Sequence, residues 1–389
     1  MPADEFVSAE LAAARKLAPD ISARALEFER ERRVAPDVVQ VMAEAGLIQM
    51  VIPACYGGLE SPLRDTLEVI EAISCADASV GWCLMNYQTT ALAAALMEPT
   101  AANEIFKNEE LAIPAGVLAP TGRARMVDDG FVVDGRWAFA SGCDNANWLL
   151  GTAFVVDEDG DPVLDDQGNQ RVLYPFFSRE QVEIHDTWFA SGLCASGSHD
   201  ISVSNALVPA GRWVCLSEAP RVDTPLFRFP IVSTFPPAVA AVNLGVAQAA
   251  FDCFVALAMD KVPAGGTGLL SERASAQIDV ARAEALIESS RSYVYATVDQ
   301  LWRDVVENKP ASVDARRRIR LAGIHAAASA AAAVDLLYNA AGASSIASSH
   351  PLQRYFRDAH AVTQHIHVSY AGMERMGRLR LTDKLDGLL

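Results

Sequence analysis

The chain has 389 residues, of which 51% are hydrophobic and 21% charged, a composition that excludes a disordered polypeptide and allows a sizeable buried core. Its formal net charge of −17 argues against nucleic acid and anionic membrane surfaces as partners. No run of 18 uninterrupted apolar residues occurs, and the start MPADEF lacks the basic flank and apolar stretch of a signal peptide. We therefore expect a globular cytoplasmic protein.

Cysteine and histidine give no sign of a metal centre. The seven cysteines are scattered without a CxxC pair, which disfavours both a disulfide framework and a zinc site. His360, His365 and His367 lie close together near the C-terminus, but no HExxH or similar ligand spacing accompanies them. We predict no metal site.

The first segment, residues 1–112, has the pattern of a helical domain, because apolar residues return every three or four positions. Pro36 suits the first turn of a helix through Asp37–Ala45, and Gly46 follows as its C-cap. Further helices are expected over Leu63–Ala76 and Val80–Met97.

The middle segment, residues 113–213, changes to a period of two. Asp129-Gly130 lies between the apolar runs Ala124–Val127 and Phe131–Phe139, which is the strongest short-range signal for a β-hairpin. Strands are also expected over Val172–Phe177 and Val182–Ile184. We predict an antiparallel β domain.

The last segment, residues 214–389, is helical again and its helices are long. We expect helices over Val239–Met259, Leu270–Glu307 and Ala311–Ala341, with small side chains that permit close packing in a bundle. A final helix, Pro351–Leu379, would carry the three clustered histidines. The predicted fold class is therefore α+β, mainly α, in the order helical domain, β domain, helical bundle.

Several short segments, rather than this order of elements, carry a resemblance to a known family. Residues 134–148 read DGRWAFASGCDNANW and resemble the flavin-contacting strand of acyl-CoA dehydrogenase-like proteins, in the Ser-Gly form of their monooxygenase branch. Residues 187–200, which begin TWFASGL and end SGSHD, resemble the second flavin-side segment. Residues 351–359, PLQRYFRDA, resemble the C-terminal helix of that branch, and with YGG at 56–58 the likeness spans nearly the whole chain.

The resemblance implies a fold, a reaction and partners. The branch includes seco-steroid phenol hydroxylase, 4-hydroxyphenylacetate hydroxylase and dibenzothiophene monooxygenase. Its members receive reduced FMN or FAD from a separate flavin reductase and hydroxylate a small aromatic, phenolic or polycyclic substrate with O2, through a flavin C4a-hydroperoxide. Their fold has an N-terminal helical domain, a central antiparallel β-barrel and a C-terminal four-helix bundle that builds a homotetramer.

Two residues of this sequence take the catalytic positions of the branch. By resemblance, Ser141 lies beside the flavin N5. A serine-glycine pair after a strand is usually only a turn, so the surrounding motif carries this assignment. His365 stands where the branch has its catalytic base, and histidine suits that role because its pKa lies near working pH. On one continuous helix His367 would face away from His365, which makes His367 and His360 the weaker candidates.

The resemblance also implies a set of flavin-binding residues. Phe139 would flank the isoalloxazine, while Gln277 and the Gly342–Ser345 loop resemble residues that reach a neighbouring subunit's flavin. Arg357 and Asp358 are expected to be structural, as an ion pair or a tie between helix and loop. The complete set of expected cofactor-binding residues is Phe139, Ser141, Gly142, Trp188, Ser196, Ser198, Gln277, Gly342 and Ser345.

Two departures from the branch pattern concern substrate orientation. Relatives often carry a further histidine on the helix after Trp82, where this chain offers only Asn86 or Gln88 as polar groups toward a substrate. Cys194 stands where relatives often place arginine.

Three alternative functions remain open at this point. A conventional acyl-CoA dehydrogenase needs a carboxylate base, but its two usual positions fall at Ile366 and near Phe235. An N-oxygenase acting on an amino sugar nucleotide would want a basic patch for the diphosphate. A flavin-free helical assembly protein is the non-enzymatic alternative.

Overall fold

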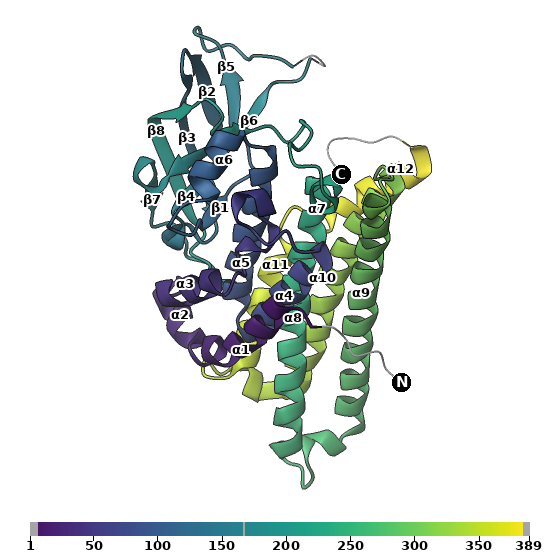
Figure 1. Cartoon of the computed structure of the whole chain (residues 1–389). Helices are drawn as coiled ribbons and strands as arrows, with labels where there is room; N and C mark the ends of the chain where they lie inside the picture. The colour runs from purple at the N-terminus through teal and green to yellow at the C-terminus, as the bar shows by residue number, and fades with distance from the viewer. Residues whose placement is uncertain (1–6, 166–167, 384–389) are drawn as a thin grey trace.

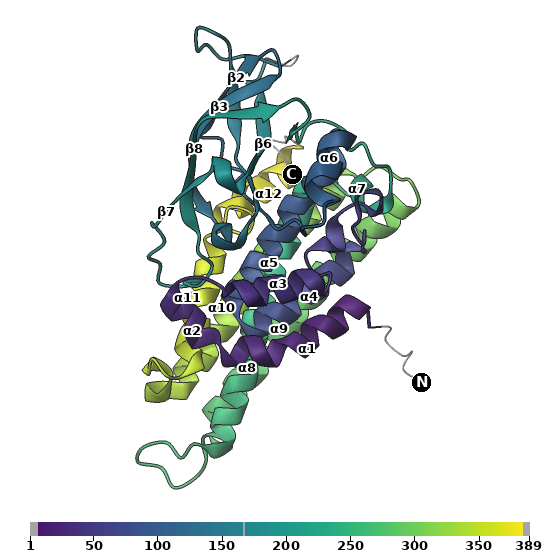
Figure 2. The same cartoon turned by 60° about the vertical axis from the view of Figure 1, so that its left-hand side comes forward.

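The structure is a computed structural model that describes residues 7–165 and 168–383. Strands gather at one end of the molecule and the long helices α8 and α9 extend away from them (Figures 1 and 2). The elements follow the predicted order along the chain. Whether residues 1–112, 113–213 and 214–389 fold as separate domains stays a prediction, and their outermost residues 1–6 and 384–389 lie outside the described part.

The N-terminal segment is helical, and the predicted helix limits agree with the structure to within a few residues. Pro36 is the first residue of its helix, and Gly46 follows that helix with a φ of 78°, which glycine adopts without strain. The helices are α1 (Ala9–Ala23), α2 (Ala25–Glu31), α3 (Pro36–Glu44), α4 (Leu63–Ala76), α5 (Ala78–Ala91) and α6 (Pro99–Phe106), with 3-10 turns η1 (Gln49–Val51), η2 (Ala54–Tyr56) and η3 (Leu92–Leu96).

The middle segment forms a curled sheet with the strand order β1-β4-β6-β5-β2-β3-β8-β7, and β9 pairs with β6. The predicted Asp129-Gly130 hairpin is confirmed, since Val127 pairs with Gly130 across the turn. The strands are β1 (Pro114–Gly116), β2 (Gly122–Val127), β3 (Gly130–Ala140), β4 (Trp148–Leu150), β5 (Ala153–Val156), β6 (Val172–Ser178), β7 (Glu183–His185), β8 (His199–Pro209) and β9 (Trp213–Val214), with 3-10 turns η4 (Cys143–Asn145) and η5 (Arg179–Gln181).

The prediction of a purely antiparallel sheet is wrong. β1 runs parallel to β4, and β2 runs parallel to β5. Parallel neighbours need a crossover connection, and here the β2–β3 hairpin is inserted between β1 and β4, so the chain re-enters in its original direction. The sheet is therefore mixed.

The C-terminal segment is a set of long helices packed side by side, in which α10 contacts α8, α9 and α11. Helix α8 begins eight residues before its predicted start, so that Pro236 and Pro237 lie inside it. The helices are α7 (Pro225–Arg228), α8 (Ile231–Asp260), α9 (Ala274–Val306), α10 (Val313–Ala341), α11 (Pro351–Thr363) and α12 (Ala371–Thr382), with 3-10 turns η6 (Leu270–Glu272) and η7 (Gly342–Ile346).

Within the part of the chain that the structure describes, two helical segments are long and apolar enough to cross a membrane by length and composition alone, Ile231–Asp260 and Val313–Ile346. In the structure, 72% and 61% of the most apolar 18-residue stretch of each helix, respectively, is buried inside the protein. Their apolar side chains therefore pack against neighbouring helices as part of the bundle core.

The prediction of one helix over Pro351–Leu379 is wrong, because the chain leaves the helix after Thr363 and resumes it at Ala371. Arg320 of α10 donates a hydrogen bond of 2.8 Å to the carbonyl oxygen of Ile366, which removes that oxygen from a helical ladder. The Thr363 hydroxyl also donates to the carbonyl oxygen of His360, a local bond that competes with regular helix. His365 and His367 consequently lie on a turn.

Candidate active site

The end of β3 is bent by a β-bulge that turns one aromatic ring outward. After an earlier irregularity between Val133 and Gly135, pairing with β8 breaks again after Trp137 and resumes at Ala140, with one extra residue on β3. Phe139 within the bulge has a φ of 67° and is 67% exposed. Its ring centroid lies 6.1 Å from that of Trp188, edge to face. A left-handed backbone conformation is unfavourable for a bulky residue and occurs most often at functional sites, so Phe139 is a candidate site residue.

A row of buried hydroxyls begins two residues further on. The Ser141 Oγ lies 2.7 Å from the Ser198 Oγ, which in turn lies 2.7 Å from the Ser196 Oγ. The indole Nε1 of Trp82 on α5 donates to the Ser141 Oγ at 2.9 Å. The structure thus brings three predicted serines together, and a fourth residue that the sequence did not single out holds the first of them.

Gly142 fixes the backbone beside this row. Its φ of 76° lies in the left-handed region, and its N–H donates to the Ser196 carbonyl oxygen at 2.8 Å. The buried Tyr87 hydroxyl donates to the Gly142 carbonyl oxygen at 3.1 Å. A Cβ at this position would lie 2.5 Å from the Tyr87 oxygen, so only glycine fits here.

Trp82 also contacts the predicted base. The His365 ring meets the Trp82 ring edge to face with centroids 5.3 Å apart, which places one indole between Ser141 and His365. The His365 and His367 rings lie 5.3 Å apart, so the expectation that they face away from each other is wrong. The turn after α11 replaces the helical geometry on which that expectation depended.

Burial and the neighbouring Arg320 keep this histidine pair neutral. Its guanidinium donates to the His367 Nδ1 at 3.0 Å, and the other face of His367 is stacked on Phe235 at 4.8 Å. Burial, followed by the nearby Arg320 charge, lowers the pKa of His365 to about 4. Burial and then the neighbouring His365 lower the pKa of His367 to about 2. Both imidazoles are therefore uncharged at neutral pH.

The His365 ring also has a weak contact with its own turn. Its Nδ1 lies 3.4 Å from the His367 backbone N–H, at the long end of hydrogen-bond distances. A neutral imidazole has one nitrogen that donates and one that accepts. His365 can therefore act as a base at its unprotonated ring nitrogen.

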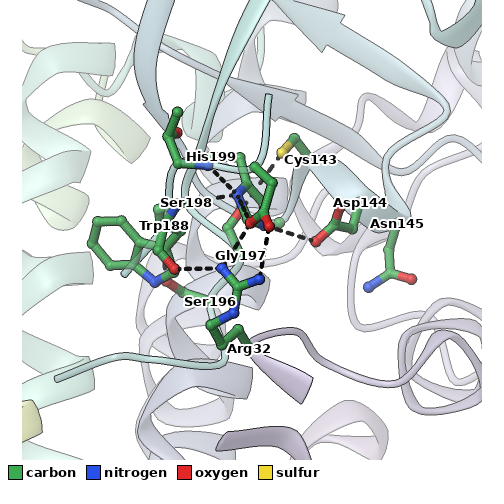
Figure 3. A network of polar contacts seen from close by, with 12 residues as sticks. Arg32, Cys143, Asp144, Asn145, Trp188, Ser196, Gly197, Ser198 and His199 are labelled. Carbon is green, nitrogen blue, oxygen red and sulfur yellow. Dashed lines mark hydrogen bonds and ion pairs between the residues drawn. The ribbon is translucent and has the colours of Figure 1, made fainter. Parts of the chain in front are cut away.

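A second polar network holds the loop that carries Trp188 (Figure 3). Arg32 forms a bidentate pair with Asp186 at 2.7 and 2.9 Å and donates to the Trp188 carbonyl oxygen at 2.9 Å. The His199 Nδ1 accepts the N–H groups of Thr187 and Trp188, each at 3.2 Å, and its Nε2 faces Asp144 at 3.6 Å. Neither Arg32 nor this pairing belongs to a motif that the sequence makes recognisable.

Helix α11 is tied to the same loop by two adjacent charged residues. Arg357 donates to the Ser191 carbonyl oxygen at 2.7 Å and to Glu29, while the Asp358 carboxyl accepts the Leu193 N–H at 2.7 Å. Burial raises the pKa of Asp358 to about 7. The expectation of a tie between helix and loop is confirmed. Arg357 also donates to the Cys194 Sγ at 3.5 Å. Although Cys194 replaces the arginine that relatives often have here, the guanidinium of Arg357 therefore lies beside the same position.

The two polar residues expected to face a substrate have other partners. The Asn86 amide exchanges hydrogen bonds with the backbone of Gly116, at 3.3 and 3.1 Å, and so joins α5 to β1. The buried Gln88 Nε2 donates to the Leu47 carbonyl oxygen at 2.6 Å, on the side of the N-terminal helices. These contacts give no support to Gln88 as a substrate group.

The remaining predicted cofactor residues lie away from the serines. Gln277 is exposed in the first turn of α9 and donates to the Ser271 carbonyl oxygen. Gly342 and Ser345 form η7, where the Ser345 hydroxyl donates to the Gly342 carbonyl oxygen at 2.7 Å. Both elements lie at the end of the bundle opposite the sheet (Figure 1). One chain alone does not bring them to Ser141.

A cavity of about 220 Å³ lies beside helices α8 and α10. It lies between η3, the segment 216–232, the first turn of α8 and α10. Its lining is mostly apolar, with polar groups from Glu218, Arg228, Thr234 and Arg316. The apolar side chains are those of Leu92, Ala95, Leu96, Leu216, Pro220, Leu226, Phe227, Phe229, Pro230, Ile231 and Val232.

Comparison with known proteins defines the class. The family model of the acyl-CoA dehydrogenase N-terminal domain matches residues 8–103, and that of the C-terminal domain matches residues 238–370. The chain belongs to the acyl-CoA dehydrogenase family, and within it this protein is a flavin-dependent monooxygenase whose cofactor is a flavin.

The relatives that place it there cover nearly the whole chain. Indole-3-acetate monooxygenase of Pseudomonas putida is 34% identical over 88% of this chain and 86% of its own length. The oxygenase subunit HsaA of a flavin-dependent monooxygenase from Rhodococcus jostii is 27% identical over 90% of this chain and 92% of its own. The structure of XiaF from Streptomyces in complex with FADH2 superimposes with a TM-score of 0.90 at 26% identity, covering 98% of this chain and 96% of that one.

The residues at the site fit a flavin. An isoalloxazine has two apolar faces and a polar edge, and the exposed Phe139 ring beside Trp188 offers aromatic surface for a planar ring. The Ser141 and Ser198 hydroxyls supply hydrogen-bonding groups for polar ring atoms. Phe139 exposes its aromatic ring to water in this structure. A bound isoalloxazine would cover the Phe139 ring, which explains its conformation.

Proposed function

We propose that this chain is the oxygenase component of a two-component hydroxylase, which takes reduced FMN or FAD from a separate reductase and hydroxylates a small aromatic substrate in the cytoplasm. The observation that carries the proposal is the position of Trp82, in contact with Ser141 on one side and His365 on the other. One indole thus separates the residue expected beside the flavin from a neutral, half-buried base. Two relatives are named for indole-3-acetate and resorcinol hydroxylation, which supports a small aromatic substrate.

In this proposal the bound flavin supplies the activated oxygen, and the protein supplies position and proton control. Ser141 and Ser198 hold the polar edge of the ring, and Phe139 and Trp188 cover its apolar surface. His365 accepts a proton from the substrate at its unprotonated ring nitrogen. The dehydrogenase alternative has little support, because its two base positions hold Ile366, which is 71% exposed, and Phe235, which stacks on His367.

The direct test is stopped-flow mixing of the protein and reduced FMN, or separately reduced FAD, with oxygenated buffer. A transient spectrum distinct from reduced and oxidised flavin, and longer-lived than in free flavin, is the expected result. The flavin that gives the longer-lived transient is the preferred one. Reoxidation at the free-flavin rate with both flavins would contradict the proposal.

We infer further that α8–α11 form a four-helix bundle that assembles the homotetramer, with Gln277, Gly342 and Ser345 reaching the flavin of a neighbouring subunit. The support is the position of these residues at the end of the bundle opposite the sheet, next to exposed apolar side chains such as Ile278 and Ile346 (Figure 1). Sedimentation at micromolar concentration is expected to give a tetramer mass, and a monomer would oppose the inference.

The lowered pKa of His365 predicts an unusual pH profile. A base must be deprotonated to act, so a pKa of about 4 keeps His365 active well below the ordinary value of 6.5. We expect product formation to stay constant from neutrality downward and to fall only as the pH approaches about 4. In Arg320→Gln the midpoint is expected to rise toward 6.5, because one cause of the lowered pKa is removed.

The measurement is the initial rate against pH, with the melting temperature followed over the same range to separate unfolding from titration. Arg318→Gln is the matched control, since Arg318 is exposed on the same helix. A lower maximum rate with an unmoved midpoint in Arg320→Gln would oppose this electrostatic role.

A further inference from the structure

Arg316 is a cation in an apolar cavity whose charge no anion neutralises. The Arg316 Nε is buried without a hydrogen-bond partner, and among residues 7–165 and 168–383 the side chain forms no ion pair. Its neighbours on α10 differ, because Arg317 pairs with Asp314 at 2.7 Å and Arg320 holds His367. A partly desolvated guanidinium without a partner is costly, and a bound anion would remove that cost.

The other charged residues that line the cavity do not neutralise the Arg316 guanidinium. Arg228 is already paired with Asp223 at 2.5 Å, so its charge is matched. Glu218 is exposed, forms no ion pair with Arg316 within the described part of the chain, and keeps its carboxylate in water. Arg316 is thus the cation left available for a ligand that enters the cavity.

The cavity and the surroundings of the histidine pair share helices α8 and α10. Arg316 lies one helical turn before Arg320, which holds His367 and the Ile366 carbonyl oxygen. Thr234 of the lining precedes Phe235, which stacks on His367. The η3 turn that forms another wall follows directly on α5, which carries Trp82. Helices α8 and α10 therefore border both the cavity and the proposed substrate site, and η3 connects the cavity wall to the helix of Trp82.

We propose that this cavity receives the anionic end of the substrate, that the substrate is a small aromatic carboxylate, and that Arg316 is the residue that selects it. A guanidinium binds a carboxylate with two parallel hydrogen bonds, and the apolar walls accept the hydrocarbon portion. The volume of about 220 Å³ is below the range of typical ligand pockets, which favours a small ligand. This inference rests on the proposed hydroxylase function and narrows its substrate class.

The test is equilibrium binding of phenylacetate and indole-3-acetate against their neutral amides, measured by calorimetry on the full chain. We expect both acids to bind the unaltered protein more tightly than their amides. In Arg316→Gln the affinity for the acids is expected to fall roughly ten- to hundredfold, as for loss of a hydrogen bond to a charged group, while the affinity for the amides is unchanged. Arg318→Gln, exposed on the same helix, is expected to behave as the unaltered protein.

A second variant keeps the proposal testable without any ligand. Arg316→Met replaces the unpaired cation with an apolar side chain of similar length and is expected to raise the melting temperature of the ligand-free protein. Equal affinity for acids and amides, no binding of either acid, or unchanged binding in Arg316→Gln would overturn the proposal.

These outcomes are separate from those of the flavin experiment. A transient flavin spectrum without acid preference would retain the hydroxylase and reject this substrate class. Acid preference without the transient would retain Arg316 as an anion site and reject the hydroxylase.

Discussion

Replacing His365 with alanine is expected to lower product formation by roughly 10²–10⁴-fold, the range for loss of a general acid or base. The reason is geometric, because His365 is the titratable group in contact with Trp82, whose indole holds Ser141. Flavin oxidation by O2 does not depend on this side chain and is expected to continue. The variant should therefore consume reduced flavin and O2 with little hydroxylated product.

The measurement is the ratio of product formed to flavin oxidised, with a substrate identified by the binding experiments. His360→Ala is the matched control, since His360 is nearby on α11, is part-exposed and pairs with Asp335 at 2.9 Å. We expect its ratio to equal that of the unaltered protein. An unchanged ratio in His365→Ala would remove the histidine from the mechanism.

Replacing Gly142 with alanine is expected to destabilise the protein by about 2–4 kcal/mol. Part of the loss, about 1–2 kcal/mol, comes from placing an L side chain at a φ of 76°. The rest is overpacking, because the new Cβ would lie 2.5 Å from the buried Tyr87 oxygen. The Ser141–Ser198 row is attached to this backbone, so weaker flavin binding is expected as well.

Urea unfolding followed by circular dichroism measures the stability change. Gly160→Ala separates the two causes, because Gly160 has a φ of 88° but nothing within 4 Å of its added Cβ. We expect this control to show only the backbone part, about 1–2 kcal/mol. Equal losses in the two variants would mean that Tyr87 yields to the added methyl group.

The sequence predicted local structure well where local rules govern it. Asp129-Gly130 formed its hairpin, and Pro36 began its helix, because each depends on a few neighbouring backbone angles. The parallel β1–β4 and β2–β5 pairs were missed because direction in a sheet depends on which strands become neighbours, and hydrophobic alternation does not encode that.

The candidate site was predicted in part. The motif around Ser141 was recognisable as a continuous segment, and the structure joins Ser141, Ser196 and Ser198 in one hydroxyl row. The contact of Trp82 with His365 comes from distant parts of the chain, and no spacing rule could reveal it. The break after α11 depends on Arg320 capturing a carbonyl oxygen, a tertiary effect that overrides the helical periodicity of Pro351–Leu379.

The turn that holds the histidine pair has a consequence for the order in which the protein acquires its activity. During synthesis the ribosome releases Trp82 and the serines long before His367 and Arg320 can meet, because α10 and the turn after α11 come late in the chain. A chain truncated before that turn keeps the flavin-side serines but lacks the residues expected to direct oxygen to a substrate. We expect such fragments to waste reducing equivalents, so completeness of the C-terminus decides whether the flavin is used productively.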